Sequence, residues 1–280
     1  MSKPTLLAVL AHPDDESFGM GGTLALYASR GVDVHLVCAT RGEVGEVPPE
    51  LLAGFDSIAE LRESELHCAA GILGLKGVHF LGYRDSGMPG SPDNIHPRAL
   101  AAQPLDEVAA NVVCYIRELK PQVVLTFDPI GGYRHPDHIA IQRAAVRAFE
   151  QAANPAFAPE SLPVHQPGRL YFHVMPHGFM KVAVKLLPLL GRDPHKFGTN
   201  GDIDIAAIAE VDFPTHARIN IRSVQEKKEK AGACHASQGG GRMGGGLVGF
   251  LMRMFSGTED FMQAYPPVVP GTGIIRDLFV

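Results

Sequence analysis

Short apolar runs alternate with longer amphipathic segments over the first 175 residues, and this alternation narrows the possible folds more than any other property of the sequence. A strand buried on both faces of a sheet gives a continuous apolar run, whereas a helix spaces its apolar residues three and four positions apart. Strands that alternate with helices indicate an α/β protein with a Rossmann-like, mostly parallel sheet and helices on both faces. The predicted strands are residues 5–11, 32–40, 77–83, 122–128 and 169–175, and the predicted helices are residues 21–31, 57–74, 104–120 and 135–153.

Two of these helices carry recognisable end signals. Ser57 is followed three residues later by Glu60, which predicts a capping box at the start of the helix, and Gly74 predicts its end. Pro136 suits the first position of another helix, with His135 immediately before it.

Residues 176–280 give a less regular pattern. Because 280 residues fit one large domain, we predict a core at residues 1–175 and a C-terminal extension at residues 176–280 packed on the same domain. The segment 247–255 reads as a short helix docked on its own domain, in preference to a membrane-surface or partner helix. The other expected elements are a helix or helix pair at 178–191, a strand at 216–223, a helix at 223–237 and a glycine-rich hinge or loop at 239–246.

Composition argues against several classes of protein. The formal net charge is −5 and no basic block occurs, so a nucleic-acid partner is not expected. The first apolar run is too short for a signal peptide or a membrane span. Cys38, Cys68, Cys114 and Cys234 form no C-x-x-C pair, and three of them lie inside apolar runs, which predicts a reduced, cytoplasmic protein.

The first chemically informative cluster is "AHPDDE" at residues 11–16, directly after the first predicted strand. Three adjacent carboxylates repel one another, and a divalent cation beside His12 would offset that repulsion. The alternative is a helix start whose first turn carries acids that the helix dipole stabilises. The cluster alone leaves both interpretations open.

A second cluster, "GGYRHPDHIAIQR" at residues 131–143, follows the fourth strand and so lies at the same sheet edge. His135 and His138 are one helical turn apart, which favours a metal site built with the first cluster. Imidazole and carboxylate donors without thiolate suit Zn²⁺, with Fe²⁺ or Co²⁺ as alternatives. The candidate ligands His12, Asp14, Asp15, His135 and His138 exceed the three that catalytic zinc takes, and a spare acid or histidine suits metal-assisted hydrolysis of an acyl bond.

Together, "AHPDDE", "TRGEVGEV" (40–47) and "GGYRHPDH" resemble the LmbE-like (PIG-L) family of zinc N-deacetylases. This family includes the N-acetylglucosaminyl-phosphatidylinositol deacetylase, the mycothiol and bacillithiol deacetylases, and mycothiol-conjugate amidase. The resemblance continues through "LRESELHCAAGILG", "YRDSGM" (83–88) and "CHASQ" (234–238). It covers roughly the whole chain and is clearest over residues 5 to 150.

The resemblance implies a role for each residue of the two histidine motifs. His12, Asp15 and His138 would bind the metal, and Asp14 would be the general base. His135, as a charged imidazolium, would stabilise the tetrahedral intermediate. Asp137 would orient the His135 ring through a hydrogen bond, and Tyr133 would donate to the oxyanion.

The resemblance also implies substrate contacts. Arg62 and Asp85 correspond to residues that contact the sugar in related enzymes. Arg41 and Glu43 are further candidates; for Glu43, a salt bridge at the strand end is an equal alternative to facing the substrate.

Three more residues are expected near the site. Arg134 stands where relatives often carry glycine, and it either attracts an anionic substrate or faces solvent. Glu16 is expected to support the metal site or to cap the following helix, and His235 to approach from the C-terminal extension.

The sequence therefore predicts a cytoplasmic, zinc-dependent hydrolase that removes an acetyl group from a small N-acetylglucosamine-type amino sugar or glycoside. Two alternatives are an amidase acting on thiol conjugates and a metal-binding protein without turnover. The glycine-rich stretch 18–22 weakly resembles a phosphate-binding loop, but the full motif is missing, which argues against a dinucleotide role.

Overall fold

The computed structural model describes residues 3–158, 162–174, 184–185, 187–190, 193–196, 204–240 and 257–280. Within these ranges, seven strands form one sheet in the order β3-β2-β1-β4-β5-β7-β6. The strands are β1 (Thr5–Leu10), β2 (Asp33–Cys38), β3 (Gly77–Phe80), β4 (Val123–Phe127), β5 (Arg169–Val174), β6 (Ala217–Asn220) and β7 (Thr258–Tyr265). The five strands β1 to β5 are parallel, and β6 and β7 are antiparallel to their neighbours, so the predicted mostly parallel sheet is confirmed.

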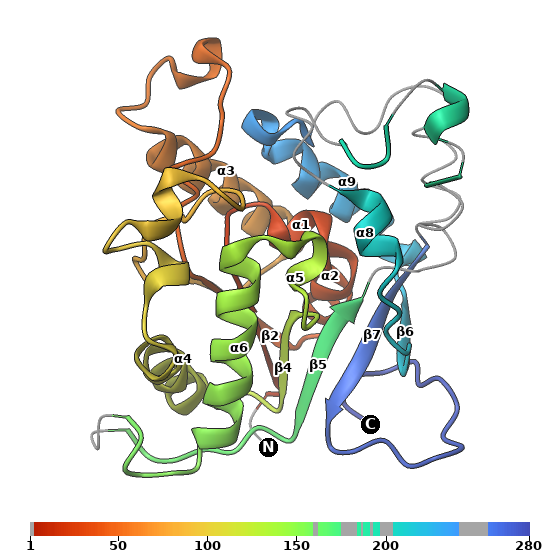
Figure 1. Cartoon of the computed structure of the whole chain (residues 1–280). Helices are drawn as coiled ribbons and strands as arrows, with labels where there is room; N and C mark the ends of the chain where they lie inside the picture. The colour runs from red at the N-terminus through yellow and green to blue at the C-terminus, as the bar shows by residue number, and fades with distance from the viewer. Residues whose placement is uncertain are drawn as a thin grey trace.

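The helices cover both faces of the sheet (Figure 1). Helices α4 (Leu105–Leu119) and α6 (Pro136–Gln151) pack against each other and against β1, while α2 (Gly21–Ser29), α3 (Ile58–Leu73) and α9 (Gln225–Cys234) form a second group. The shorter helices are α1 (Asp15–Phe18), α5 (Gly131–Arg134) and α8 (Ile205–Ala209). Single 3-10 turns are η1 (Pro49–Leu52), η2 (Pro92–Ile95), η3 (Leu100–Ala102), η4 (Leu187–Leu190), η5 (Arg222–Val224) and η6 (Ala236–Gln238).

Strand order reverses between β1 and β4, the two central parallel strands. From β1 the chain passes to β2 and β3 on one side, and then crosses to β4 and β5 on the other. The loops after β1 and β4 therefore diverge at the carboxyl edge of the sheet, where open α/β sheets bind their ligands. The first histidine cluster lies in the loop after β1, and the second extends from the connection after β4 into the first turns of α6.

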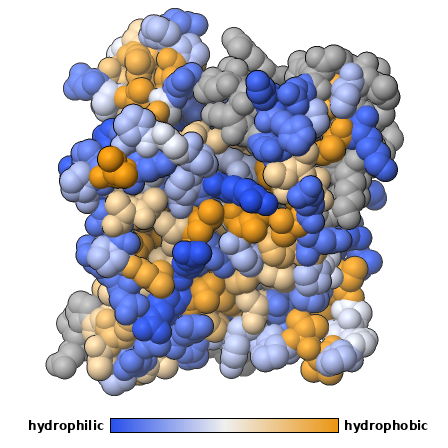
Figure 2. Space-filling model, in the orientation of Figure 1, coloured by the Kyte–Doolittle hydropathy of each residue, from blue (hydrophilic) through white to orange (hydrophobic). Residues whose placement is uncertain are grey.

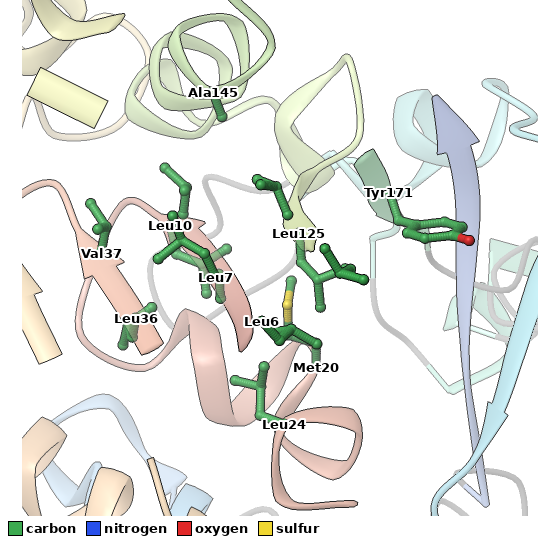
Figure 3. Close-up of a cluster of buried hydrophobic side chains, with 14 of the residues drawn as sticks. Leu6, Leu7, Leu10, Met20, Leu24, Leu36, Val37, Leu125, Ala145 and Tyr171 are labelled. Carbon is green, nitrogen blue, oxygen red and sulfur yellow. The ribbon is translucent and has the colours of Figure 1, made fainter. Parts of the chain in front are cut away.

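The core lies between the sheet and its two helical layers. Figure 3 shows Leu7 and Leu125 of the sheet between Ala145 of α6 on one side and Met20 and Leu24 on the other. All five side chains are buried. The apolar runs of the central strands β1 and β4 are thus buried on both faces of the sheet.

The predicted end signals of α3 are present. The Ser57 hydroxyl accepts the Glu60 N–H at 3.2 Å, and Gly74 adopts a left-handed conformation with φ of 80° after the last turn. The Glu60 carboxylate accepts the N–H of Asp56 at 2.7 Å, one residue before the position a standard capping box uses. Backbone hydrogen-bonding groups at both ends of α3 therefore find partners within a few residues of the helix.

Strand β7 was not predicted from the sequence. Two of its residues, Glu259 and Asp260, are buried acids, which interrupt the apolar pattern of a strand. The Glu259 carboxylate accepts the N–H groups of Gly22 and Thr23, at 3.0 and 2.7 Å, at the start of α2. A protein carboxylate thus occupies the helix N-terminus that follows the glycine-rich stretch, a position where other proteins bind anions.

The C-terminal predictions are confirmed in part. The predicted strand at 216–223 is β6 and the predicted helix at 223–237 contains α9. Most of the predicted helical segment 178–191 and of the glycine-rich segment 239–246, and all of 247–255, lie outside the described residues.

The expectation of four reduced cysteines is wrong for one pair. Cys68 of α3 and Cys234 of α9 form a disulfide, with Cα atoms 6.0 Å apart, whereas Cys38 and Cys114 are free. The two partners are separated by 166 residues, and only the packing of α9 on α3 brings them together. Sequence spacing carries no signal for such a pair.

A helix that crosses a bilayer needs about 20 predominantly apolar residues. Among the described residues, no helix has the length and apolar character for this. Hydrophilic and hydrophobic residues are interspersed over the face visible in Figure 2.

Candidate metal centre and active site

The loop after β1 carries the first cluster in a tightly constrained conformation. His12 is buried, with 5% of its surface exposed, and its backbone N–H donates to Asp15 Oδ2 at 2.7 Å. Asp14 has a φ of 121°, a value that a residue with a Cβ rarely adopts, and Asp15 then begins α1. The turn therefore separates the two aspartate side chains.

The loop after β4 carries the second cluster. Asp128 Oδ1 accepts the N–H groups of Ile130 and Gly132, both at 3.0 Å, which fixes the turn leading to Tyr133. Gly131 has a φ of 67°, and a Cβ there would lie 2.8 Å from that of His138. Its carbonyl lies 3.2 Å from His138 Nδ1, so this glycine both makes room for the imidazole and orients it.

The two loops bring their donor atoms to one point. His12 Nδ1 lies 3.2 Å from His138 Nε2, which in turn lies 3.2 Å from Asp15 Oδ1. Asp15 Oδ2 is 3.7 Å from His12 Nδ1. Two ligands of a tetrahedral zinc ion, each bound at about 2.0–2.1 Å, stand about 3.3 Å apart, so this spacing suits one ion. The ring nitrogens of His12, His135 and His138 also lie within 4.8 Å of one another.

The charges around this point also suit a cation. Burial acts to lower the pKa of His12, but the carboxylates of Asp85, Asp137 and Asp15 outweigh it and raise that pKa well above 6.5. Burial acts to raise the pKa of Asp15, yet His138 and His12 hold it well below its ordinary range. The acidic surroundings favour positive charge among the rings, which a divalent ion provides. The residues present fit a metal.

Asp137 differs from its predicted role. Its carboxylate contacts His12 Nε2 at 3.1 Å and accepts the N–H of Ser86 at 2.8 Å and the Ser86 hydroxyl, so it orients His12 and not His135. The bond between Asp137 and His135 is instead a helix cap, in which the Asp137 backbone N–H donates to His135 Nδ1 at 3.2 Å. A carboxylate on the far nitrogen of a metal-binding histidine is a common arrangement.

His135 also differs from its predicted charge state. Burial, together with His12 and His138, lowers its pKa to about 2, which disfavours the imidazolium. The start of α6 disfavours it further, since a helix N-terminus is positive. Because Nδ1 accepts the Asp137 N–H, the neutral ring carries its proton on Nε2. These surroundings favour a neutral His135 ring that can donate through Nε2.

Asp14 lies beside this cluster and forms an ion pair with Arg62. The Arg62 guanidinium donates to Asp14 Oδ2 at 3.1 Å. Burial raises the pKa of Asp14 to about 6, against the opposing effect of Arg62 and with a further increase from Asp15. A carboxylate with a pKa near 6 both holds and releases a proton near neutral pH.

Of the four predicted substrate residues, the structure brings Arg62 and Asp85 to the centre. Arg62 is buried and also donates to the carbonyls of Gly42, at 2.9 Å, and Pro13, at 2.7 Å. Asp85 Oδ1 lies 3.6 Å from His12 Nε2. Arg62 thus ties the loops after β1 and β2 to Asp14, a function that the sequence did not indicate.

Arg41 and Glu43 make other contacts. The Arg41 side chain pairs with Glu63 of α3 at 2.8 Å and lies over the Phe80 ring, with its guanidinium carbon 4.9 Å from the ring centroid. The Glu43 carboxylate accepts the Arg41 backbone N–H at 3.1 Å. Both residues belong to the loop after β2 at the carboxyl edge, and their assignment to the substrate stays a prediction.

Two aromatic residues frame His138. The Tyr133 ring meets it edge-on at a centroid distance of 4.8 Å, and Phe127 stacks on it at 4.0 Å. Burial raises the pKa of Tyr133 well above 10, so its hydroxyl keeps its proton and can donate it. Arg134 is exposed and donates to the Ala207 carbonyl of α8 at 3.3 Å.

Sequence reasoning assigned no role to Ser86, Asp128 or Phe127. Ser86 lies within the quoted "YRDSGM", directly after Asp85, so its position in that motif was the available signal. Asp128 and Phe127 end the fourth strand, where polar and aromatic residues are expected to face a ligand, but nothing in the sequence sets them apart.

Comparisons with known proteins identify a family and several relatives of this chain. A family model described as GlcNAc-PI de-N-acetylase matches residues 7–149. A 1D-myo-inositol 2-acetamido-2-deoxy-alpha-D-glucopyranoside deacetylase 1 from Catenulispora acidiphila is 39% identical, with 98% of this chain and 88% of that protein covered. A deacetylase of the same description from Geodermatophilus obscurus is also 39% identical, covering 83% of this chain and 82% of the relative.

Solved structures share the fold. A conserved protein from Thermus thermophilus is 25% identical with a TM-score of 0.61, covering 96% of this chain and 98% of that one. The N,N'-diacetylchitobiose deacetylase from Pyrococcus horikoshii, at 21% identity, has a TM-score of 0.53 over 96% of this chain and 87% of its own. A 4-carboxy-2-hydroxymuconate hydratase from Pseudomonas putida has a TM-score of 0.62 at 20% identity, covering 96% and 100% of the two chains. Since a hydratase shares the fold, the fold alone does not define the reaction.

Proposed function

The chain belongs to the GlcNAc-PI de-N-acetylase (PIG-L) family, and from that membership we propose that it is a metal-dependent hydrolase that removes the acetyl group from an N-acetylglucosamine-type glycoside. One observation carries the proposal: the two histidine clusters converge beside Asp14 at the point where strand order reverses. We infer that the substrate is an inositol glycoside, because the relatives that cover most of this chain are described as deacetylases of 1D-myo-inositol 2-acetamido-2-deoxy-alpha-D-glucopyranoside.

We assign the metal to His12, Asp15 and His138, whose donor atoms stand 3.2 to 3.7 Å apart. Zinc suits this set of two imidazoles and one carboxylate. Bound there, it would act as a Lewis acid on the acetamide carbonyl and on water. Asp137 keeps the far nitrogen of His12 in place, and the Gly131 carbonyl does the same for His138.

Asp14 is the proposed general base. As water attacks the acetamide carbonyl carbon, Asp14 takes one of its protons, and the burial that raises its pKa to about 6 gives it the basicity for this. The proton then passes from Asp14 to the amide nitrogen as the C–N bond breaks. The products are acetate and the free amine, and Asp14 returns to its starting state.

His135 and Tyr133 are the proposed donors to the oxygen that becomes negative during the attack. The neutral His135 ring offers its Nε2 proton because its Nδ1 is held by the helix cap. Tyr133 adds its hydroxyl from the constrained turn before α6. Donors fixed in place before the reaction need no reorganisation as charge develops, and one such donor contributes about 10²–10³ in turnover.

The test is amide hydrolysis of a panel of substrates by the purified, metal-loaded protein, measured as acetate release and as free-amine release. The panel contains the inositol glycoside, N-acetylglucosamine, N,N'-diacetylchitobiose and an amide-linked thiol conjugate. We expect acetate release from the inositol glycoside. Chelation should abolish this activity and Zn²⁺ should restore it, and the activity restored by Fe²⁺ and by Co²⁺ is measured for comparison. Cleavage of the thiol conjugate alone would instead indicate an amidase. Metal binding without turnover of any substrate would overturn the proposed hydrolase function.

A further inference from the structure

The backbone of Asp14 requires support from outside its own turn. Its φ of 121° lies in a region that side chains with a Cβ rarely adopt, and such conformations persist only where the surroundings impose them. Arg62 holds the side chain and the preceding carbonyl. The Asp14 N–H donates to Glu16 Oε2 at 3.0 Å, so the orientation of the Glu16 carboxylate also defines that of Asp14.

Glu16 is fully buried, and its second oxygen is held by two donors. The Ser17 hydroxyl donates to Oε1 at 2.5 Å, and His235 Nε2 lies 2.7 Å from the same atom. His235 is also fully buried, and its ring meets Phe18 edge-on at 5.9 Å. Its other nitrogen, Nδ1, has no hydrogen-bond partner among the described residues, so the contact with Glu16 is the polar contact that places this ring.

The chain anchors His235 on both sides. The preceding residue, Cys234, is bonded to Cys68 of α3. Two residues later, the N–H and hydroxyl of Ser237 donate to the two oxygens of buried Glu65, at 2.8 and 2.6 Å. Both anchors lie on α3, the helix that also carries Arg62. Helix α3 thus carries both Arg62, which contacts Asp14 directly, and the two residues that anchor His235.

We propose that His235 is a positioning residue for the deacetylation, acting through Glu16 to hold the backbone of Asp14 in the conformation that directs its carboxylate to the attacking water. This inference rests on the proposed function for its chemistry. The C-terminal extension would then contribute to catalysis, because His235, 219 positions beyond Glu16, helps to hold Asp14 in place. His235 itself touches neither metal ligands nor substrate in this scheme.

The test compares substitutions at His235 in the wild-type protein and in the Asp14→Asn variant. His235→Leu removes both ring nitrogens at similar bulk, and His235→Asn is a shorter polar alternative should the leucine variant not fold. His235→Gln keeps a donor that can reach Glu16. We expect the first two to lower kcat about 10- to 100-fold with KM and metal content unchanged, and the glutamine variant to recover most of the loss.

The double variants isolate the route through Asp14. Combined with Asp14→Asn, His235→Leu is expected to cause less than about a two-fold further loss, because residues that act as one unit are not additive. His165→Leu is the matched control, since it removes another histidine contact of 2.7 Å, to the Pro121 carbonyl, and should leave kcat unchanged. Unchanged kcat in His235→Leu, or an equal loss in both backgrounds, would overturn the proposal.

A crystal structure of the His235→Leu variant gives a result that does not depend on turnover. We expect Asp14 to leave its positive φ, and to keep it in His235→Gln and His165→Leu. If the wild-type protein released no acetate from any sugar, the proposed function would fail while this structure still decided the role of His235. A structure of His235→Leu in which Asp14 keeps a φ near 121° would contradict the proposal.

Discussion

Asp14 and Asp15 are neighbours in the chain, yet their surroundings push their acidities apart. Burial raises the pKa of Asp14 to about 6, whereas His138 and His12 hold that of Asp15 well below its ordinary range. Two carboxylates with separated pKa values are suited to different tasks, one exchanging a proton and the other binding a cation. The positive φ of Asp14 makes this possible, because it turns the two side chains toward different partners.

Replacing Asp14 with asparagine should remove the proposed general base while leaving the proposed metal ligands intact. We expect kcat to fall about 10²- to 10⁴-fold, the range typical of a general base, with bound metal near the wild-type level. Turnover and metal content of the same preparation measure this. Asp106→Asn, at an exposed aspartate paired with Arg147, is the control. Full activity in the Asp14 variant would rule out its role as the base.

Asp137 contributes through His12. Its carboxylate holds His12 Nε2 and is itself held by Ser86, so Asp137→Asn should weaken the orientation of the ring. We expect metal affinity to drop about 10- to 100-fold, as found for carboxylates behind metal-binding histidines. Competition with a chelator of known affinity measures the change, with Asp93→Asn, which pairs with Arg84, as the control. An unchanged affinity would mean that Asp137 serves the fold alone.

Among the secondary-structure elements, β7 links the sheet to the helix behind the first loop. Its Glu259 accepts two N–H groups at the start of α2 and pairs with Lys228 of α9 at 2.6 Å. Lys228 also donates to the carbonyl of Gly19, at 3.1 Å. A single buried carboxylate therefore joins β7, α2 and α9, and α9 is the helix that ends beside His235.

Glu259→Gln should destabilise this junction. Breaking a buried ion pair leaves the remaining charge unpaired, and because Lys228 is partly exposed we expect a loss of about 2–3 kcal/mol in the free energy of unfolding. Urea unfolding at pH 7 measures it. Glu226→Gln, which removes the exposed pair with Lys230, should change stability by less than about 0.5 kcal/mol.

The same pair predicts a dependence on pH. Burial opposes ionisation of Glu259, but Lys228 and Thr23 outweigh it and hold its pKa below the ordinary 4.5. A carboxyl group with a lowered pKa stabilises the folded state above its unfolded value, and this contribution disappears as pH falls through the folded value. The stability difference between wild type and Glu259→Gln should be constant above about pH 5 and shrink below 4.5. A difference that grows on acidification would contradict the pairing.

At the scale of the whole molecule, the C-terminal segment closes the structure over the first half of the chain. Strand β7 pairs with β5, β6 pairs with β7, and α9 packs on α3. The Leu278 N–H donates to the Tyr27 hydroxyl of α2 at 2.6 Å. We propose that residues 1–175 and the C-terminal extension form one domain, since they share a sheet and a buried charge network.

The disulfide between Cys68 and Cys234 should stabilise this closure. It spans 166 residues, and linking distant segments restricts the unfolded chain. We expect the double variant Cys68→Ser/Cys234→Ser to lose about 2–4 kcal/mol in the free energy of unfolding without reductant. Dithiothreitol should lower the wild type to the same value, and Cys114→Ser, at a free cysteine, is the control. Identical unfolding midpoints with and without reductant would indicate that the bond contributes nothing.

Sequence by itself determined those features whose physics is local. Buried parallel strands read as apolar runs, and the five strands of the parallel part were predicted within three residues at each end. The caps of α3 and the position of Pro136 follow from backbone hydrogen bonding within one turn. The two histidine motifs follow strands β1 and β4, and parallel topology places the ends of those strands at one edge. The convergence of the two histidine motifs at one edge was therefore foreseeable.

The tertiary structure alone decided the properties of side chains whose partners are distant in sequence. The partner of Asp137 is His12 and not His135, the charge of His135 depends on burial among the other rings, and Arg62 reaches Asp14 across two loops. The disulfide, the buried acids of β7 and the contact of His235 with Glu16 have no periodic or local pattern to reveal them. Local patterns specify elements and their edges, whereas pairing, burial and protonation arise only when distant side chains share one low-dielectric space.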